Sequence, residues 1–489
     1  MRAGSEAKVK VAVVMQRRRL SSWLMASLLL AAGLASPALA HTSERVFILT
    51  LPSDLYIAGG AIVVAVSFVL VALVPAANLR VVESLGWRGG RLPDWLGRIP
   101  SLLSLLVIVV LVLAGHLGTQ DPLANPLPLM VWTVWWIGLT MAHALLGNLW
   151  AALNPWCGLA DLLAAVVRPP LRYPTWLGYW PAWIQFLAFA WFELIYTVPQ
   201  NPEILADVVM FYFLANLAGC LLFGHAAWLR QAECFAVFFR VVAWLSPLNG
   251  RPDGEDGDRA SGTLFVTLPG LGLLHLRPLP ISGVAFVLLA LGSVSFEGLA
   301  ITYWWLDLIG VNPLDFPGRS AVALSNTLGL LSVFAVWMAC YLTVVWLGHR
   351  LAGSPVPLSE AFGSYVISIV PIALGYHFAH YLTAFLVDMQ YAAITLNDPF
   401  GQGWNLFGLA DAHATTSFLS NYDSVRLIWH LQIGVIVIVH VMAVSIAHMI
   451  ALRQCGERGT AILSQIPMTL LMIGYTLFGL WLLSTAAIG

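Results

Sequence analysis

Long apolar stretches of about 20 residues, almost free of charged side chains, recur from residue 55 to the end of the chain. As a helix, each is long enough to cross the roughly 30 Å of hydrocarbon in a bilayer. The pattern therefore predicts an all-α, polytopic transmembrane helix bundle with about ten spans. We place these spans at residues 55–77, 101–118, 127–150, 178–199, 203–228, 280–305, 322–348, 361–388, 428–451 and 465–487.

The composition agrees with this pattern. The chain of 489 residues is 60% hydrophobic and 10% charged, whereas a soluble domain is about 45–50% apolar and about 25% charged. A formal net charge of −1 provides no basic surface for nucleic acid, and the five cysteines show no CxxC spacing for a thiolate metal site. The predicted partner is the lipid bilayer. A chain this apolar is also compatible with being the membrane half of a complex with a partner subunit.

The first 40 residues have the three parts of a secretory signal peptide. Arg17, Arg18 and Arg19 form a positive region, residues 20–34 are apolar, and residues 38–40 read Ala-Leu-Ala, a cleavage-site pattern. Met15 is a candidate for the true start. Cleavage after residue 40 would make His41 the mature N-terminus and leave residues 41–489 as a single transmembrane domain.

Arginines fall in alternate loops between the predicted spans. Cytoplasmic loops carry the excess of basic residues, so the pattern predicts a bacterial inner-membrane protein with both mature termini periplasmic. The predicted inner loops contain Arg80, Arg88, Arg91, Arg98, Arg168, Arg172, Arg230, Arg240, Arg251, Arg259, Arg277, Arg350, Arg453 and Arg458, and the outer side has only Arg45, Arg319 and Arg426.

Three segments between the spans have a character of their own. Residues 249–262 form a polar, glycine-rich inner loop. Residues 233–248 are apolar with arginine interruptions, which is typical of a segment lying along the inner interface. Residues 389–425 carry aromatic and turn-forming residues, and we expect them to form a cap over the outer ends of the helices.

Ionisable groups inside predicted spans are costly, so each is a functional candidate. His377 and His380 lie three residues apart on one predicted helix and therefore share a face. Asp388 lies about 20° from the face of His377 at 3.6 residues per turn. Tyr376 and Tyr381 flank the histidine pair.

Further candidates lie at similar depth on other spans. His440 is near the middle of the next span, and Glu297 and Glu193 lie in the outer parts of two more. We predict that these residues meet around one outward-opening polar cavity, where His377, His380 and His440 would bind a divalent metal. Imidazoles with a carboxylate suit zinc, copper or non-haem iron.

Hydrogen bonding between helices is the alternative role for a membrane histidine. We favour hydrogen bonding for His143, His116 and His225. For His377, His380 and His440 we weigh hydrogen bonding and metal binding equally. His440 and His448 are about 80° apart around one helix and about 12 Å apart along it, which is too far to share one ion.

Several stretches together resemble the bacterial membrane family known as fenitrothion hydrolase. They are the first span with its preceding Leu-Pro segment, and then WAALNPW at 150–156, PIALGYHFAHY at 371–381 and DPFGQGWNLFG at 398–408, followed by the span that holds His440 and His448. The resemblance covers most of the mature chain. It implies hydrolysis of an organophosphorus triester with release of a nitrophenol, and it supplies no catalytic residues to carry over.

Three functions follow as hypotheses. In the first, a metal held by the histidines activates water to attack an apolar small-molecule substrate, with Glu297 or Asp388 as a further ligand or the general base. In the second, the same histidines and the amine of His41 hold copper for delivery or electron transfer. In the third, histidines and carboxylates relay protons in a proton-coupled transporter.

Overall fold

The computed structural model describes residues 53–74, 86–91, 98–163, 168–251, 263–312 and 318–485. The predicted signal peptide and His41 lie outside these residues, as does most of the polar inner loop.

Nine helical segments in the described ranges are long and apolar enough to cross a membrane. Each coincides with one predicted span, which confirms the all-α polytopic bundle. They are α2 (Ser53–Leu73), α4 (Ile99–Leu117), the continuous run of α5 (Pro126–Leu129), the π-helix η2 (Met130–Leu139) and α6 (Thr140–Leu146), α10 (Pro202–Phe223), α13 (Ile281–Ala300), α15 (Arg319–Ala352), the run of α16 (Leu358–Tyr365), η6 (Val366–Ile369) and α17 (Val370–Thr395), α18 (Tyr422–Cys455) and α19 (Arg458–Ser484).

Shorter elements connect and support these segments. They are α7 (Trp150–Leu153), α8 (Pro155–Leu163), η3 (Thr175–Leu177), α9 (Trp180–Leu194), α11 (His225–Gln231), α12 (Cys234–Ala243), η4 (Leu271–His275), α14 (Tyr303–Leu308) and η7 (Ser417–Ser420), with strands β1 (Gly86–Arg91), β2 (Leu248–Arg251) and β3 (Thr263–Thr267).

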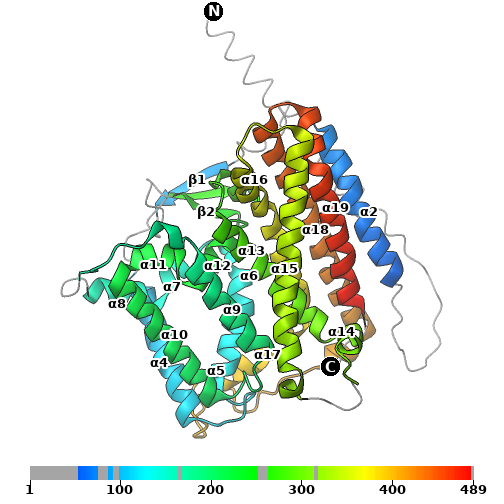
Figure 1. The fold of residues 1–489 in the computed structure, drawn as a ribbon. Helices are drawn as coiled ribbons and strands as arrows, with labels where there is room; N and C mark the ends of the chain where they lie inside the picture. Colours follow the sequence, from blue (N-terminus) through cyan, green and yellow to red (C-terminus); the bar gives the residue numbers. More distant parts are fainter. Residues whose placement is uncertain are drawn as a thin grey trace, which may run out of the picture.

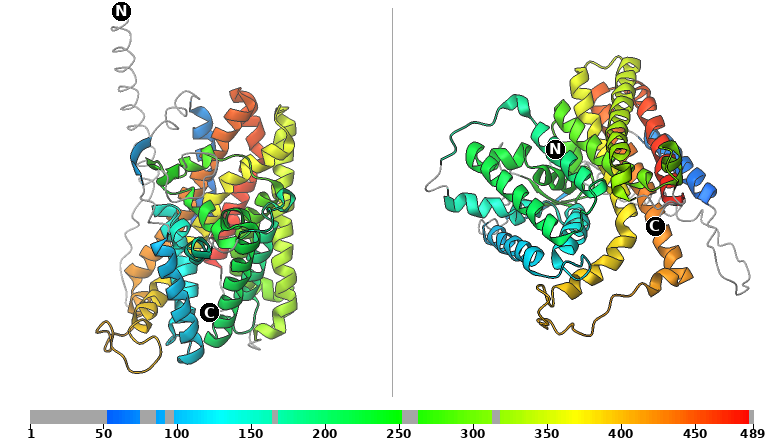
Figure 2. Two further views of the ribbon diagram at one scale, coloured as in Figure 1. Left: turned by 90° about the vertical axis from the view of Figure 1, so that its left-hand side faces the viewer. Right: turned by 60° about the horizontal axis from the view of Figure 1, so that its bottom comes forward.

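A small antiparallel sheet joins two distant loops at one end of the bundle. Its strand order is β1-β3-β2, with Trp87 opposite Val266 and Leu248 opposite the same residue on the other side. We call this end of the molecule the sheet face. The opposite end carries the loop between α17 and α18 and is called the loop face (Figures 1 and 2).

The sheet also fixes the role of α9. Because β1 and β2 lie at the same end, the chain between them must cross the bundle an even number of times. The helices α4, α5–α6 and α10 supply three crossings, so α9 must supply the fourth. It has only 15 residues, which extend about 22 Å at 1.5 Å per residue, and it therefore takes the place of the tenth predicted span while being short for a bilayer.

The helices form two groups (Figure 2). One group contains α4 to α12 from the first half of the chain. The other contains α15 to α19 together with α2, so the first described helix packs against the last two. The helices α13 and α17 contact both groups, because α13 packs on α9 and α15 while α17 packs on η2 and α18. Side chains from α9, η2, α13 and α17 therefore meet at the boundary between the groups.

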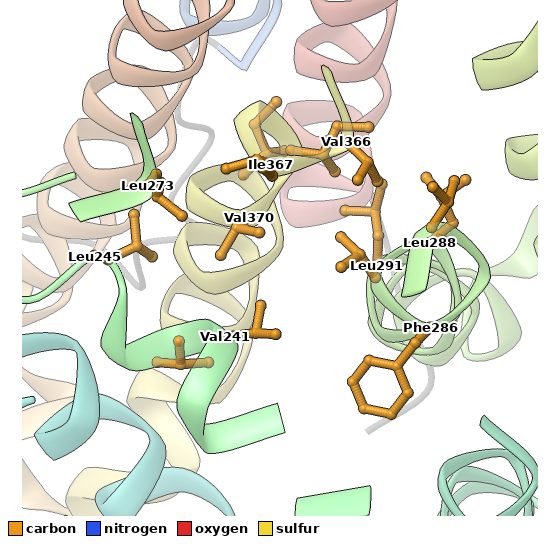
Figure 3. Packing of buried hydrophobic residues seen from close by; sticks show 14 of the residues in the cluster. Val241, Leu245, Leu273, Phe286, Leu288, Leu291, Val366, Ile367 and Val370 are labelled. Atoms are coloured by element: carbon orange, nitrogen blue, oxygen red, sulfur yellow. The ribbon is translucent and has the colours of Figure 1, made fainter. Parts of the chain in front are cut away.

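The helix α12 lies inside the protein, and the expectation of an interfacial segment at residues 233–248 is wrong. Of its ten residues all except Arg240 are buried, because its aromatic side chains pack against η2 and α9 on one side and α17 on another. Val241 faces Phe286 of α13 and Val370 of α17 in this core (Figure 3). The helix is amphipathic in sequence, but other helices of the protein, and not a membrane surface, pack around it.

The outer loop is shorter than predicted. The helix α17 continues to Thr395 and α18 begins at Tyr422, so the connection comprises residues 396–421 instead of 389–425. Asp398 accepts hydrogen bonds from the backbone N–H groups of Gln402 and Gly403 at 2.9 and 2.6 Å. Residues 398–403 thus form an ordered turn, while every residue from 401 to 408 is exposed. A cap packed over the outer ends of the helices stays a prediction.

Small residues allow helices to approach closely, and a substitution at Gly348 tests the contact between α15 and α19. A Cβ atom there would lie 2.0 Å from the carbonyl oxygen of Ser464 on α19, so Gly348→Ala must push α15 and α19 apart. We expect a loss of about 1–3 kcal/mol of stability, measured as a lower midpoint of thermal unfolding in detergent. Gly474→Ala on α19 is the control, because no atom lies within 4 Å of its added Cβ. Equal stability of the two variants would contradict this packing.

Candidate functional site

Two carboxyl groups and a histidine meet around one phenol where the two helix groups join. Glu193 is the penultimate residue of α9, and Glu297 lies one turn before the end of α13. The Tyr381 hydroxyl of α17 lies 3.1 Å from Glu193 Oε1 and also hydrogen-bonds Glu297 Oε2. His380 Nε2 lies 3.3 Å from Glu297 Oε1. We call these four residues the carboxyl cluster.

Hydrogen counting limits how Tyr381 can bond the two carboxyl groups. An ionised carboxylate can only accept hydrogen bonds, and a phenol has one hydrogen to donate. Tyr381 therefore cannot satisfy Glu193 and Glu297 at once if both are ionised. If one of the two carboxyl groups carries a proton, it can donate that proton to the Tyr381 oxygen while the other carboxylate accepts the hydrogen of Tyr381. Two carboxyl groups sharing one site characteristically hold a proton between them in this way.

The π-helix η2 supplies a further contact. Trp136 lies within it and donates its indole N–H to the Tyr381 oxygen at 3.2 Å. Its side chain is 2% exposed. A π-helical segment is rare and is frequent at functional sites, and here it directs a tryptophan from the first helix group onto the phenol of the second.

His377 lies next to the carboxyl cluster without joining it. Its ring makes edge contacts with Trp136 and Tyr381, with centroids 4.8 and 4.7 Å apart. Neither ring nitrogen makes a well-formed hydrogen bond to a described residue. The ring lines a cavity of about 30 Å³ whose other walls are mainly apolar residues such as Phe238, Val241 and Val294.

The structure places the remaining predicted residues apart from the carboxyl cluster. His440 lies against Tyr475, with ring centroids 6.1 Å apart, and no contact joins it to His377 or His380 in the described ranges. Asp388 makes no hydrogen bond or ion pair there either. Those ranges contain no group of three or more His, Cys, Asp or Glu residues arranged to hold a metal ion. Zinc or copper binding by the predicted ligands, including His41, stays a prediction.

The structural role predicted for His143 is confirmed. Its Nδ1 lies 2.6 Å from the carbonyl oxygen of Leu139, and its Nε2 accepts from the backbone N–H of Trp150 at 2.8 Å. Both nitrogens are therefore used within the fold. His116 and His225 pair with Asp207 and Asp161 at 3.5 and 3.9 Å, at the surface of the first helix group.

An arginine borders the carboxyl cluster at the loop face. Arg319 begins α15 and donates to the carbonyl oxygens of Glu193 and Tyr196 at 2.8 and 3.1 Å. A cation is favourable at the C-terminal end of a helix, where carbonyl groups lack partners. Arg319 thus fixes the end of α9 and brings a positive charge beside the carboxylates. His380 and Glu297 each leave 21% of the side chain accessible, so the cluster is not sealed.

The sequence predicted part of this site. It placed Glu193, Glu297 and His380 around one polar region, and they do meet. It did not predict that Tyr381 would join the two carboxyl groups, although the residue was noted beside the histidine pair. Trp136 was missed, because nothing in the apolar sequence around it distinguishes it from the neighbouring tryptophans.

Comparison with protein-family models, with curated proteins and with solved structures gives no match. The resemblance to fenitrothion hydrolase therefore stays a prediction, and the arguments below rest on the geometry of the site.

Tyr381→Phe tests whether the Tyr381 hydroxyl joins Glu193 and Glu297. The variant removes the hydroxyl that joins the carboxyl groups and that accepts from the Trp136 N–H at 3.2 Å, and losing such a buried contact costs about 1–3 kcal/mol. We expect a lower midpoint of thermal unfolding in detergent. Tyr303→Phe is the control, because Tyr303 is 49% exposed. A Tyr381→Phe protein as stable as the wild type would show that the bridge is absent.

Proposed function

We propose that this multi-pass membrane protein is proton-coupled and that the carboxyl cluster binds and releases a proton within the membrane. The observation that carries the proposal is the single hydroxyl of Tyr381 between Glu193 and Glu297. A proton can leave one carboxyl group for the phenol oxygen while the phenol's own proton moves to the other carboxylate. Tyr381 is neutral before and after this exchange, and the negative charge moves from one helix to another.

The size of the available space favours proton chemistry over triester hydrolysis. Sites for small molecules have volumes of about 300–1,000 Å³. The cavity beside His377 has about 30 Å³, which suits one or two waters and excludes an aryl phosphorothioate. The pair of His380 and Glu297 has the composition of a general base, but it does not line this cavity.

We further propose that the sheet face is cytoplasmic and the loop face periplasmic, in a bacterial inner membrane. Support comes from the arginines, since basic residues concentrate in cytoplasmic loops. The elements and ends of helices at the sheet face carry Arg88, Arg91, Arg98, Arg230, Arg251, Arg350, Arg453 and Arg458, against Arg319 and Arg426 at the loop face. The carboxyl cluster would then lie closer to the periplasm.

The shared proton predicts a specific infrared signature. A protonated carboxyl group has a C=O stretching band that shifts in D₂O, and the purified wild-type protein should show it. Glu297→Gln and Glu193→Gln should each remove the band, because the one remaining carboxylate can accept the hydrogen of Tyr381 without a proton of its own. Infrared difference spectra of wild type minus variant measure this directly.

Glu203→Gln is the matched control. Glu203 lies in the first turn of α10 with its side chain exposed, so its replacement should leave the band unchanged. A band that persists in both cluster variants would mean that the proton belongs to another group, and the proposal would fail.

A separate assay addresses the hydrolase hypothesis. Purified protein incubated with a nitrophenyl phosphorothioate should release no nitrophenolate above the rate in empty detergent, because the substrate does not fit. Release that stops with a chelator and in His377→Ala and His380→Ala variants would instead establish the metal-dependent hydrolase.

A further inference from the structure

The loop between α17 and α18 exposes several large apolar side chains at the loop face. Leu406 and Phe407 are 58% and 68% exposed. Trp404 is 46% exposed and packs edge-on against Phe400, with ring centroids 5.7 Å apart. We call these four residues the apolar tip. Exposed apolar side chains gathered in one place mark a contact with a membrane or with another protein.

The side chain of Asn397 holds the apolar tip in a defined shape. It is 4% exposed, and its Oδ1 accepts from the backbone N–H groups of Phe407 and Leu409 at 2.8 and 3.3 Å. Its own carbonyl oxygen accepts from the N–H of Leu406 at 3.1 Å. Asp398 fixes the preceding turn in the way described above. The loop backbone therefore directs these side chains outward in one arrangement.

The loop lies beside the end of a helix whose exposed side is apolar. The exposed side chains of α4 recur at helical spacing and so share one face, at Leu106, Val110, Leu113 and Leu117. On a helix long enough to span a bilayer, such a face meets the acyl chains. Gly118 follows this helix directly, and a Cβ atom on it would lie 3.4 Å from the carbonyl oxygen of Pro399 (Figure 1). The apolar tip thus begins where the exposed face of α4 ends.

The length of α4 sets the depth of the apolar tip in a membrane. The helix has 19 residues, which extend about 28 Å at 1.5 Å per residue, and the hydrocarbon of a bilayer is roughly 30 Å thick. The end of α4 therefore lies near the edge of the hydrocarbon, and the adjacent loop lies at the level of the headgroups. Tryptophan is enriched at this level in membrane proteins, because its ring is amphipathic.

The lack of charge distinguishes this surface from a docking site for another protein. Protein interfaces have a polar rim and are enriched in arginine, whereas residues 399–410 contain no charged side chain. Asp398, directly before this segment, is occupied by two backbone N–H groups of its own loop. A boundary between lipid and water suits an uncharged aromatic and aliphatic surface that continues the exposed face of α4.

We propose that the apolar tip inserts into the bilayer at the loop face and that phospholipid of the adjacent leaflet is its partner. Trp404, Leu406 and Phe407 contact acyl chains just beneath the headgroups, while Asn397 keeps the loop backbone folded. Because the loop directly follows α17, it fastens the end of that helix to the membrane. The inference is independent of the proton site.

Photocrosslinking identifies the partner of the apolar tip. Benzoylphenylalanine replaces Phe407 in the full-length chain, cell membranes are irradiated, and the purified protein is weighed by mass spectrometry. We expect an adduct with the mass of one phospholipid. The same replacement at Leu113, on the exposed face of α4, is the positive control. Asp411, an exposed charged residue of the same loop, is the negative control.

Two results at residue 407 would overturn the proposal. An adduct with another protein would make the apolar tip a docking surface. No adduct at residue 407, with the lipid adduct at residue 113 present, would place the tip in water.

Asn397→Leu tests whether the shape of the loop presents the apolar tip. The variant removes the acceptor of the Phe407 and Leu409 N–H groups, so the lipid adduct at residue 407 should be lost. The adduct at residue 113 should remain, which shows that the bundle is intact. Gln402→Leu is the matched control, because Gln402 is exposed in the same loop and Asp398 holds its backbone and not its side chain. Undiminished labelling in Asn397→Leu would contradict the proposed arrangement.

Discussion

The hydroxyl of Tyr381 has one hydrogen and lies between two carboxyl groups that both need it. In water the shortfall would be trivial, since solvent would supply another donor. Between packed helices fewer donors are available, and an ionised carboxylate without a donor is expensive. The proton that we propose on Glu193 or Glu297 would supply the missing donor. The remaining contacts of the site, from Trp136 and His380, hold the phenol and the two carboxyl groups together.

Another buried carboxyl group shows that such a proton is not a general consequence of burial. Glu233 is fully buried at the start of α12, where it accepts from the backbone N–H groups of Phe235 and Ala236 at 2.8 and 2.6 Å and from the side chains of Tyr212 and Trp150. Its donors are sufficient for an ionised carboxylate. Glu233 fixes a helix end inside the bundle, whereas Glu193 and Glu297 have the one hydrogen of Tyr381 between them. The number of backbone N–H donors, and not depth, distinguishes Glu233 from this pair.

The sequence predicted the helices well because the bilayer leaves few alternatives. Apolar length alone located the nine long segments, and the positions of arginines grouped the loops that the sheet later joined. The sequence was less informative about segments that are surrounded by protein and not by lipid. The helix α12 looks interfacial in sequence, yet α17 and η2 cover it. The same limit applies to the site. Spacing placed His377 and His380 on one face, but the identity of their neighbours depends on how α9 and α13 pack, which no single-helix pattern contains.

The role of His440 could not be predicted from its position in the sequence. As a mid-span histidine it qualified equally as a ligand or a bonded core residue. In the structure one nitrogen is bonded to its own helix and the other is bare, and the partner across the contact is the phenol ring of Tyr475. His448, two turns further along α18, has its donor and acceptor reversed by Gln465. In a structural histidine such as His143, both ring nitrogens make hydrogen bonds. His440 and His448 differ from it, because the Nε2 atom of each ring is buried without a partner among the described residues, and a buried polar atom left unpaired costs about 1–3 kcal/mol.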